Sequence, residues 1–118
     1  MITVPTVTLD HFVEERGIDR VDLIKMDIEG HEDRAYRGMR EVIAANRDHL
    51  RMIIEFTTSE YRDPHGFYDQ IREDFRFVYG IEFVTGRLIE TTTLADVTDL
   101  HRPDFTLLLT SNTEVSLD

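Results

Sequence analysis

Short apolar runs alternate with segments of helical spacing along most of the chain. Residues 21–28 (VDLIKMDI) and 51–56 (RMIIEF) are apolar and β-branched, with charges at their edges. Such runs are typical of buried parallel strands. The segment between them has apolar residues at the offsets of four, seven and eight that one helical face requires. These residues are Ala35, Met39, Val42 and Ile43.

A shorter helix is expected before the first strand, after an extended piece over residues 2–7. Thr8 or Asp10 can cap the N-terminus of this helix, and Gly17 ends it, because glycine readily takes the left-handed conformation found after helices. Gly38 falls inside the next predicted helix, where glycine costs about 1 kcal/mol relative to alanine. We therefore expect a close packing contact at Gly38.

The second half of the chain continues the alternation with weaker signals. We expect a polar loop (57–66), a short helix (66–73), a strand (75–83), a short return strand (87–90), a loop (94–103) and a last strand (105–110). Alternating strands and helices predict parallel crossovers and therefore an α/β sheet. The last two long strands have no predicted helix between them, so they should pair antiparallel.

Composition narrows the class of protein. The 118 residues are 41% apolar, which suits one domain with a small core. The net charge of -11 argues against nucleic acid or an anionic membrane as a partner, and it fits an ordinary soluble surface. No cysteine is present, which fits a cytoplasmic protein. The first ten residues lack the pattern of a signal peptide, and no apolar run approaches the length of about 20 residues that a membrane span needs.

Candidate chemistry gathers after the first buried strand, because ligands of open α/β sheets bind beyond the carboxyl ends of the strands. Asp27 lies at the carboxyl end of this strand, and Glu55 lies at the carboxyl end of the next. In one interpretation, Asp27 faces a substrate or cofactor hydroxyl, and Glu29 or His31 takes a proton. In the other, Asp27 and Glu29 only cap the following helix, where acids are favourable, and His31 is a surface residue.

A metal site is a weaker alternative at the same place. Asp27, Glu29, His31 and Glu32 combine oxygen donors with one imidazole, a set that could suit magnesium or manganese. Their spacing matches no defined metal motif, so we predict no metal ligands.

The loop after the second strand carries further polar residues. Tyr61, Arg62 and His65 lie where substrate loops often occur, so position alone makes them candidates. The sequence has no serine-hydrolase, zinc-protease or glycine-rich phosphate motif.

Four stretches of the chain resemble the FkbM family of S-adenosylmethionine-dependent methyltransferases. They are VTLD (7–10), VDLIKMDIEGHE (21–32), RG (37–38) and IIE (53–55). The run Asp-x-Glu-Gly-x-Glu after an apolar strand is the most specific of these features. The resemblance covers residues 7–56, and the remainder agrees only in the order of its elements.

The resemblance implies a partial Rossmann-like methyltransferase sheet, made of the fourth to the antiparallel seventh strand of seven, with flanking helices. The family methylates oxygen, typically on sugars or natural-product scaffolds. Carried over to this sequence, Asp27 faces the active site with Glu29 beside it, so Asp27 is the first choice of general base and His31 the second. Glu55 and Tyr61 would lie on the substrate side.

The family's first half is the part that this sequence lacks. That half holds a glycine-rich loop and an acid that bind S-adenosylmethionine, and nothing before Val4 can supply them. We therefore expect residues 1–118 to be one partial domain that does not bind S-adenosylmethionine alone, with cofactor-binding residues unknown.

The missing half also determines which binding partners we expect. Without it, one edge of the strand at 21–28 is unpaired and should recruit another strand. We expect a homodimer or a complementary N-terminal-half chain. The alternative to an enzyme is a non-catalytic accessory module that acts through oligomerisation.

Overall fold

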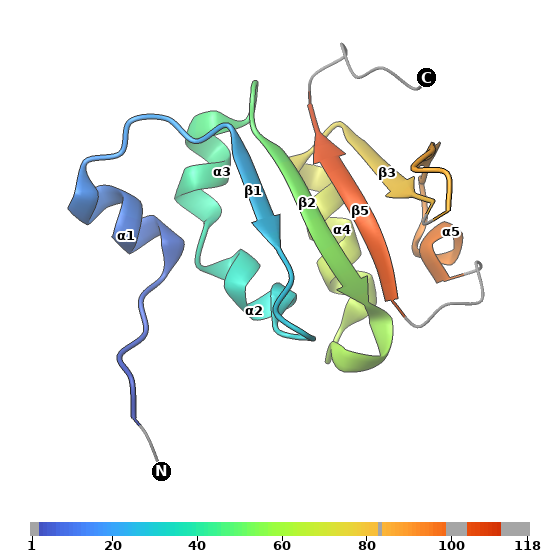
Figure 1. The fold of residues 1–118 in the computed structure, drawn as a ribbon, viewed down its shortest axis with the longest axis horizontal. Helices are drawn as coiled ribbons and strands as arrows, with labels where there is room; N and C mark the ends of the chain where they lie inside the picture. Colours follow the sequence, from blue (N-terminus) through green and yellow to red (C-terminus); the bar gives the residue numbers. More distant parts are fainter. Residues whose placement is uncertain (1–2, 83, 99–103, 112–118) are drawn as a thin grey trace.

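The computed structural model describes residues 3–82, 84–98 and 104–111, which form an open mixed sheet with helices (Figure 1). The strands are β1 (Leu23–Met26), β2 (Arg51–Thr57), β3 (Phe77–Ile81), β4 (Leu88–Glu90) and β5 (Asp104–Thr110). The helices are α1 (Leu9–Arg16), α2 (Glu32–Arg37), α3 (Arg40–Asn46), the 3-10 turn η1 (Thr58–Glu60), α4 (Pro64–Asp74) and α5 (Leu94–Thr98).

The sheet has the strand order β1-β2-β5-β3-β4. β1 and β2 are parallel, with Met26 opposite Ile54, whereas β5 lies antiparallel between β2 and β3. β3 and β4 form an antiparallel hairpin. The predicted α/β class, the antiparallel last strand and the short return strand are therefore confirmed.

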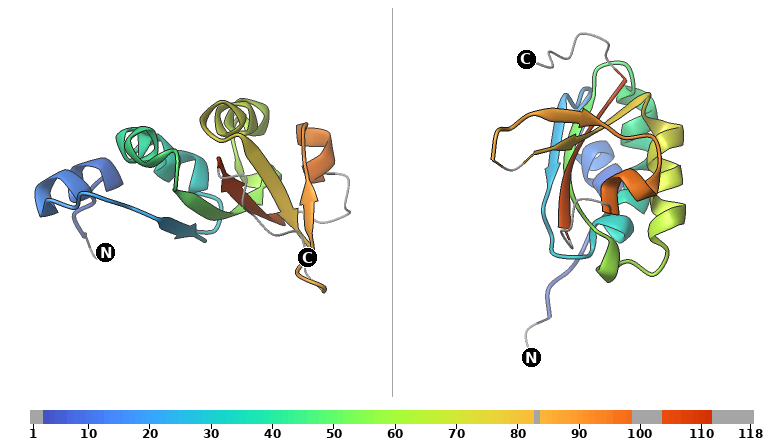
Figure 2. Two further views of the ribbon diagram at one scale, coloured as in Figure 1. Left: turned by 90° about the horizontal axis from the view of Figure 1, so that it is seen from above. Right: turned by 90° about the vertical axis from the view of Figure 1, so that its right-hand side faces the viewer.

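The described helices cover one face of the sheet, and Figure 2 shows the other face without a helical layer. Along β2, Met52, Ile54 and Phe56 are fully buried toward the helices, whereas the alternating residues Ile53 and Glu55 are half-buried. This period of two is what a sheet with one covered face produces.

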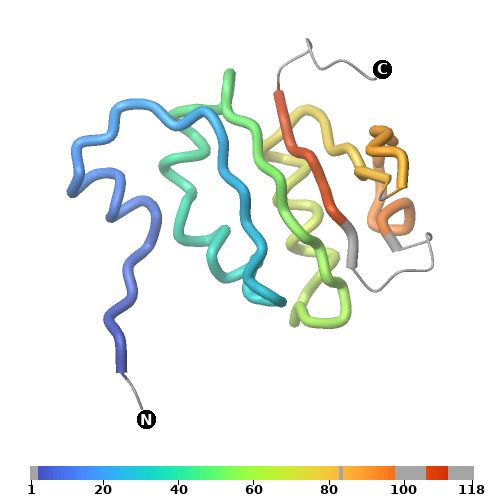
Figure 3. The backbone as a smooth tube through the Cα atoms, viewed as in Figure 1, coloured from blue at the N-terminus to red at the C-terminus, as the bar shows by residue number. Residues whose placement is uncertain are grey.

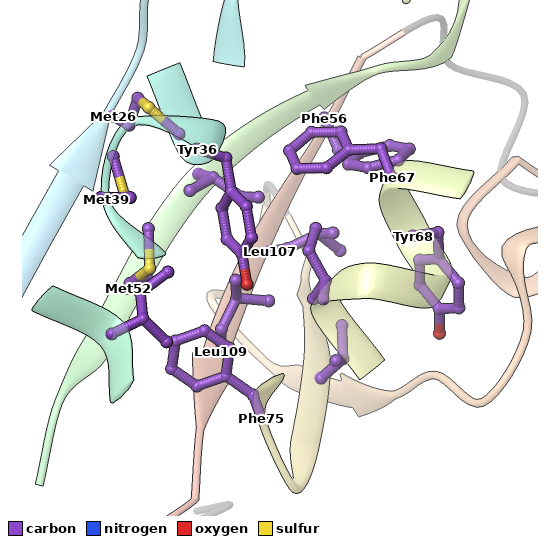
Figure 4. Packing of buried hydrophobic residues seen from close by; sticks show 14 of the residues in the cluster. Met26, Tyr36, Met39, Met52, Phe56, Phe67, Tyr68, Phe75, Leu107 and Leu109 are labelled. Atoms are coloured by element: carbon purple, nitrogen blue, oxygen red, sulfur yellow. The ribbon is translucent and has the colours of Figure 1, made fainter. Parts of the chain in front are cut away.

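The core lies between β2, β5 and the helices α2 to α4 (Figure 4). Tyr36, Phe56 and Phe67 form its aromatic centre, with ring centroids 5.3 Å apart for both Tyr36–Phe67 and Phe56–Phe67. Tyr36 also donates a 2.7 Å hydrogen bond to the buried Asp74. Among the described residues, no buried side-chain nitrogen or oxygen lacks a hydrogen-bond partner. The polar groups of the core are therefore hydrogen-bonded, as expected for a well-packed interior.

β1 is shorter and more exposed than the run at 21–28 predicts. It has four residues, of which only Met26 is buried, and the Leu23 side chain is 59% exposed. The apolar composition suggested cover on both faces, but β1 is an edge strand with no helix on its outer face. The prediction of a buried strand is therefore wrong in extent, although parallel pairing is confirmed.

The predicted long helix is two helices, α2 and α3, which are separated at Gly38 and Met39. The carboxylate of Asp10 accepts hydrogen bonds from the backbone N–H groups of Glu41 (3.1 Å) and Val42 (2.9 Å), so a residue of α1 caps α3. The close contact expected at Gly38 is confirmed, because a Cβ atom there would lie 3.0 Å from Cβ of Thr8.

The remaining bounds differ in detail. Thr8, not Asp10, caps α1, and Gly17 ends it at φ 63° as expected. The supposed loop at 57–66 contains η1 and the start of α4, which Asp63 caps by accepting from the N–H of Gly66. α5 occupies part of the supposed loop at 94–103. Residues 1–2, 83, 99–103 and 112–118 lie outside the described residues, so parts of the predictions at 2–7, 75–83 and 94–103 are not tested.

Candidate functional site

The loops after β1 and β2 lie side by side at one edge of the sheet, as the tube in Figure 3 shows. Because the two strands are parallel, their carboxyl ends meet there. The register pairs Met26 with Ile54, so Asp27 and Glu55 follow at the same level in neighbouring chain segments. This is the edge at which open α/β sheets bind ligands.

The three residues predicted to be catalytic are on the surface of this edge. Asp27, Glu29 and His31 are all exposed. Glu29 has φ 51°, the one positive φ of a non-glycine residue in the described part of the chain. His31 is at the N-cap position of α2 but makes no side-chain capping bond.

The alternative that Asp27 and Glu29 cap the following helix is wrong. The acids in the first turn of α2 are Glu32 and Asp33, and no hydrogen bond to the Asp27 or Glu29 carboxylate is found among the described residues. Asp27 and Glu29 are therefore available to solvent or to a ligand.

Glu32 is the acid that organises this loop. Its side chain is 0% exposed. Its two oxygens accept hydrogen bonds from the N–H of Ile28 (Oε2, 3.0 Å) and the N–H of Gly30 (Oε1, 3.2 Å). From the sequence, Glu32 lies at the end of the Asp-x-Glu-Gly-x-Glu run, with no expected role except that of a possible metal ligand. The signal that could have found its role is an acid two residues after a glycine turn, at the start of a helix.

Tyr61 joins the same network from the loop after β2. Its hydroxyl accepts from the N–H of Thr57 (3.1 Å), and its single proton has two acceptors in reach, Oε1 of Glu32 (2.9 Å) and the carbonyl of Glu55 (3.0 Å). Burial raises the pKa of Tyr61, and the Glu32 carboxylate raises it further. Tyr61 is therefore a neutral hydrogen-bond donor inside the protein, with its ring against Phe56.

The other candidates are spread over the same edge. Glu55 lies within β2, which runs one residue further than the predicted 51–56, and its side chain is half-buried on the face without helices. Arg62 and His65 are exposed, and His65 lies in the first turn of α4. The pairing of β1 with β2 places Asp27 at the same level as Glu55, whereas the Tyr61 side chain points into the core.

The possible metal ligands do not converge. Glu32 points inward to the loop backbone and Tyr61, whereas Asp27, Glu29 and His31 are exposed. Within the described ranges, no group of three or more histidine, aspartate or glutamate side chains could hold a metal ion.

The glycines of the described residues can be compared with the kind of loop that binds S-adenosylmethionine in α/β sheets. Such a loop uses open glycine backbone between a strand and a helix. In the loop between β1 and α2, a Cβ atom at Gly30 would lie 2.8 Å from Cβ of Glu60, so that space is filled. Gly17 and Gly86 have open space beside them, but Gly17 ends α1 and Gly86 lies in the turn between β3 and β4.

Comparison with known proteins gives one match. The family model described as Methyltransferase FkbM domain matches residues 1–79, a span that includes β1, β2 and both loops of the candidate site. No curated protein and no solved structure matches the chain. No helix in the described part of the chain is long and apolar enough to cross a membrane.

Proposed function

The chain belongs to the Methyltransferase FkbM domain family, and from this premise we propose that it forms the acceptor side of an S-adenosylmethionine-dependent O-methyltransferase. In this proposal, residues 1–118 are one partial domain. Their sheet corresponds to the fourth to seventh strands of a Rossmann-like methyltransferase. The antiparallel position of β5 supports this correspondence.

The exposed carboxylate of Asp27 carries the proposal. It follows directly after β1, it is level with Glu55 on β2, and it makes no hydrogen bond or ion pair within the described residues. A carboxylate in this position can accept the proton of an acceptor hydroxyl, a role that contributes about 10²–10⁴-fold to such reactions. Glu29 lies beside it, and His31 is the second candidate for the base.

The methyl donor needs a binding site separate from that of the acceptor. S-adenosylmethionine is the donor that the family implies, and Gly30, the glycine of the loop after β1, has no open space beside it. We propose that a complementary N-terminal-half chain holds the donor, and we assign no residue of this chain to it. This proposal leaves the described residues with acceptor binding and proton removal.

The proposed acceptor is a hydroxyl group on a sugar or natural-product scaffold, as in the family. Glu55 lies on the substrate side of the site in this proposal. Tyr61 acts on that side indirectly, because its hydroxyl is turned inward to Glu32. We also propose a cytoplasmic location, which rests on the absence of cysteine alone.

Replacement of Asp27 tests the proposal. Methyl transfer from S-adenosylmethionine to a panel of sugar and polyketide hydroxyls is measured by mass spectrometry, with the complete protein and any partner that copurifies. We expect Asp27→Asn to lower kcat by about 10²-fold or more. Asp48→Asn is the matched control, because Asp48 is also exposed but follows α3, before β2 begins. Equal activity of the two variants would contradict the assignment of Asp27.

A second candidate function is a non-catalytic module that acts through association. Six of the eight large apolar side chains that are exposed in the described residues belong to residues 4–28. They are Val4, Val7, Phe12, Ile18, Leu23 and Ile28. This concentration beside an open strand edge favours a homodimer or a complementary chain on the β1 side. A stable monomer in light scattering at micromolar concentration would exclude a homodimer as the form in which such a module acts.

A further inference from the structure

The buried carboxylate of Glu32 has no cation to balance it. Its three hydrogen-bond donors are two backbone N–H groups and the Tyr61 hydroxyl. No lysine, arginine or histidine forms an ion pair with it in the part of the chain that the structure describes. A buried, unpaired carboxylate is costly, and an apolar side chain would fill the same space at lower cost. Packing alone therefore does not account for Glu32.

The hydrogen bonds of Glu32 hold an unusual backbone. The N–H groups that it accepts belong to Ile28 and Gly30, on either side of Glu29. Glu29 has φ 51° and Gly30 has φ 94°, so two successive residues are left-handed. A non-glycine residue persists in this conformation only where the surroundings fix it. Glu32 supplies that constraint, and in doing so it sets the direction of the backbone that carries Asp27 and Glu29.

The loop after β2 holds the same turn from the other side. Tyr61 places its hydroxyl on Glu32 and also accepts from the N–H of Thr57 at the end of β2. Glu60 packs against Gly30. The ends of the two parallel strands are thus tied together through one carboxylate, and movement of either loop breaks a buried hydrogen bond.

We infer that Glu32 is the positioning residue of the candidate site: through the backbone of residues 28–30 it holds the carboxylates of Asp27 and Glu29, and Tyr61 locks it to the end of β2. This inference rests on the proposed function for its consequence in catalysis. Glu32 itself touches no reacting atom, because it is fully buried. Its effect is on where two neighbouring carboxylates lie.

Glu32→Gln separates this role from simple packing. Glutamine has almost the same shape, but it offers one acceptor oxygen where glutamate offers two. One of the N–H groups of Ile28 and Gly30 must then lose its acceptor. We expect hydrogen exchange at the amide that loses its acceptor to become about tenfold faster in the complete chain, while exchange at the amides of β2 stays unchanged. The carboxyl carbon signals of Asp27 and Glu29 in nuclear magnetic resonance should shift, and that of Asp10 should not.

Asp33→Asn is the matched control. Asp33 is the adjacent buried acid in the same turn of α2, but its Oδ1 accepts from the N–H of Arg34 and not from the loop. This variant should leave the exchange of Ile28 and Gly30 unchanged. Equal acceleration in both variants, or equal acceleration in β2, would show a general loss of stability and overturn the inference.

Tyr61→Phe provides the test if Glu32→Gln does not fold, because it removes only the hydroxyl and keeps the ring. We expect a smaller acceleration, about threefold, at the same two amides; unchanged exchange there would overturn the link to β2. These results are independent of methyl transfer. If Asp27→Asn keeps full activity while Glu32→Gln loosens the loop, the proposed function fails and the positioning role stands. If Glu32→Gln leaves the loop and the carboxyl signals unchanged, the positioning role fails alone.

Discussion

At the scale of single residues, acids only a few positions apart have opposite surroundings. Asp27 and Glu29 face solvent, whereas Glu32 is enclosed by backbone N–H groups and a tyrosine hydroxyl. The difference follows from the turn between them, where Glu29 and Gly30 are left-handed. This turn directs one carboxylate inward to the loop backbone and leaves the other two exposed.

Gly30 is the position where this turn depends most on the absence of a side chain. In Gly30→Ala, the new methyl would meet Cβ of Glu60 at 2.8 Å, on a backbone with φ 94°. Gly17→Ala is the matched control, because Gly17 has φ 63° but open space around it. We expect Gly17→Ala to lower the free energy of unfolding by about 1–2 kcal/mol, the cost of left-handed backbone. Gly30→Ala should lose about 2–5 kcal/mol, because overpacking adds about 1–3 kcal/mol. Urea unfolding measures both losses, and equal losses would contradict the contact with Glu60.

The sequence could predict that Asp27, Glu29 and His31 follow the carboxyl end of a strand, but not the orientation of each acid. Whether these residues act on a substrate stays a prediction. Burial within this acidic cluster could not be predicted, because the side-chain alternation of a strand ends at Met26. The inward position of Glu32 depends on Tyr61, which is 29 residues away in the sequence.

At the scale of helices and strands, the periodic apolar pattern predicted the elements well and their ends less well. The spacing of Ala35, Met39 and Val42 continues across the break between α2 and α3, because both helices bury the same side. The break depends on Asp10, whose carboxylate caps α3 from α1. The sequence carries a local signal for α5, because Asp96 accepts a hydrogen bond from the N–H of Thr93, as the acid of a capping box does.

β1 is the element whose edge most needs a partner. The carbonyl of Asp22 accepts from the N–H of Arg51, so the backbone groups of Asp22 point toward β2. Backbone groups alternate in direction along a strand, so those of Leu23 and Lys25 point to the open edge. No strand in the described part of the chain lies beyond them. An apolar strand with such an edge is a template for pairing.

A charge on this edge should weaken association. Leu23→Lys places an ammonium on the 59% exposed side chain at the open edge, and lysine on an edge strand opposes pairing. Val84→Lys is the matched control, since Val84 is 82% exposed but lies between β3 and β4. Light scattering of the complete chain should show a lower average mass for Leu23→Lys and no change for Val84→Lys. The same mass for both variants would exclude the β1 edge as the interface.

At the scale of the whole molecule, the described residues form one helical layer on one face of an open sheet (Figures 1 and 2). Asp27 and Glu55 lie at the same level near the carboxyl ends of β1 and β2, and Gly30 beside them is packed against Glu60. We propose a division of labour, in which these acids serve the acceptor and another chain holds the methyl donor.

Calorimetric titration of S-adenosylmethionine into the isolated chain tests this division most directly. With the chain at micromolar concentration and the donor raised to the millimolar range, we expect no saturable heat, because in this proposal another chain holds the donor. A saturable binding curve with a dissociation constant in the micromolar range would contradict the account and would place the donor site within this chain.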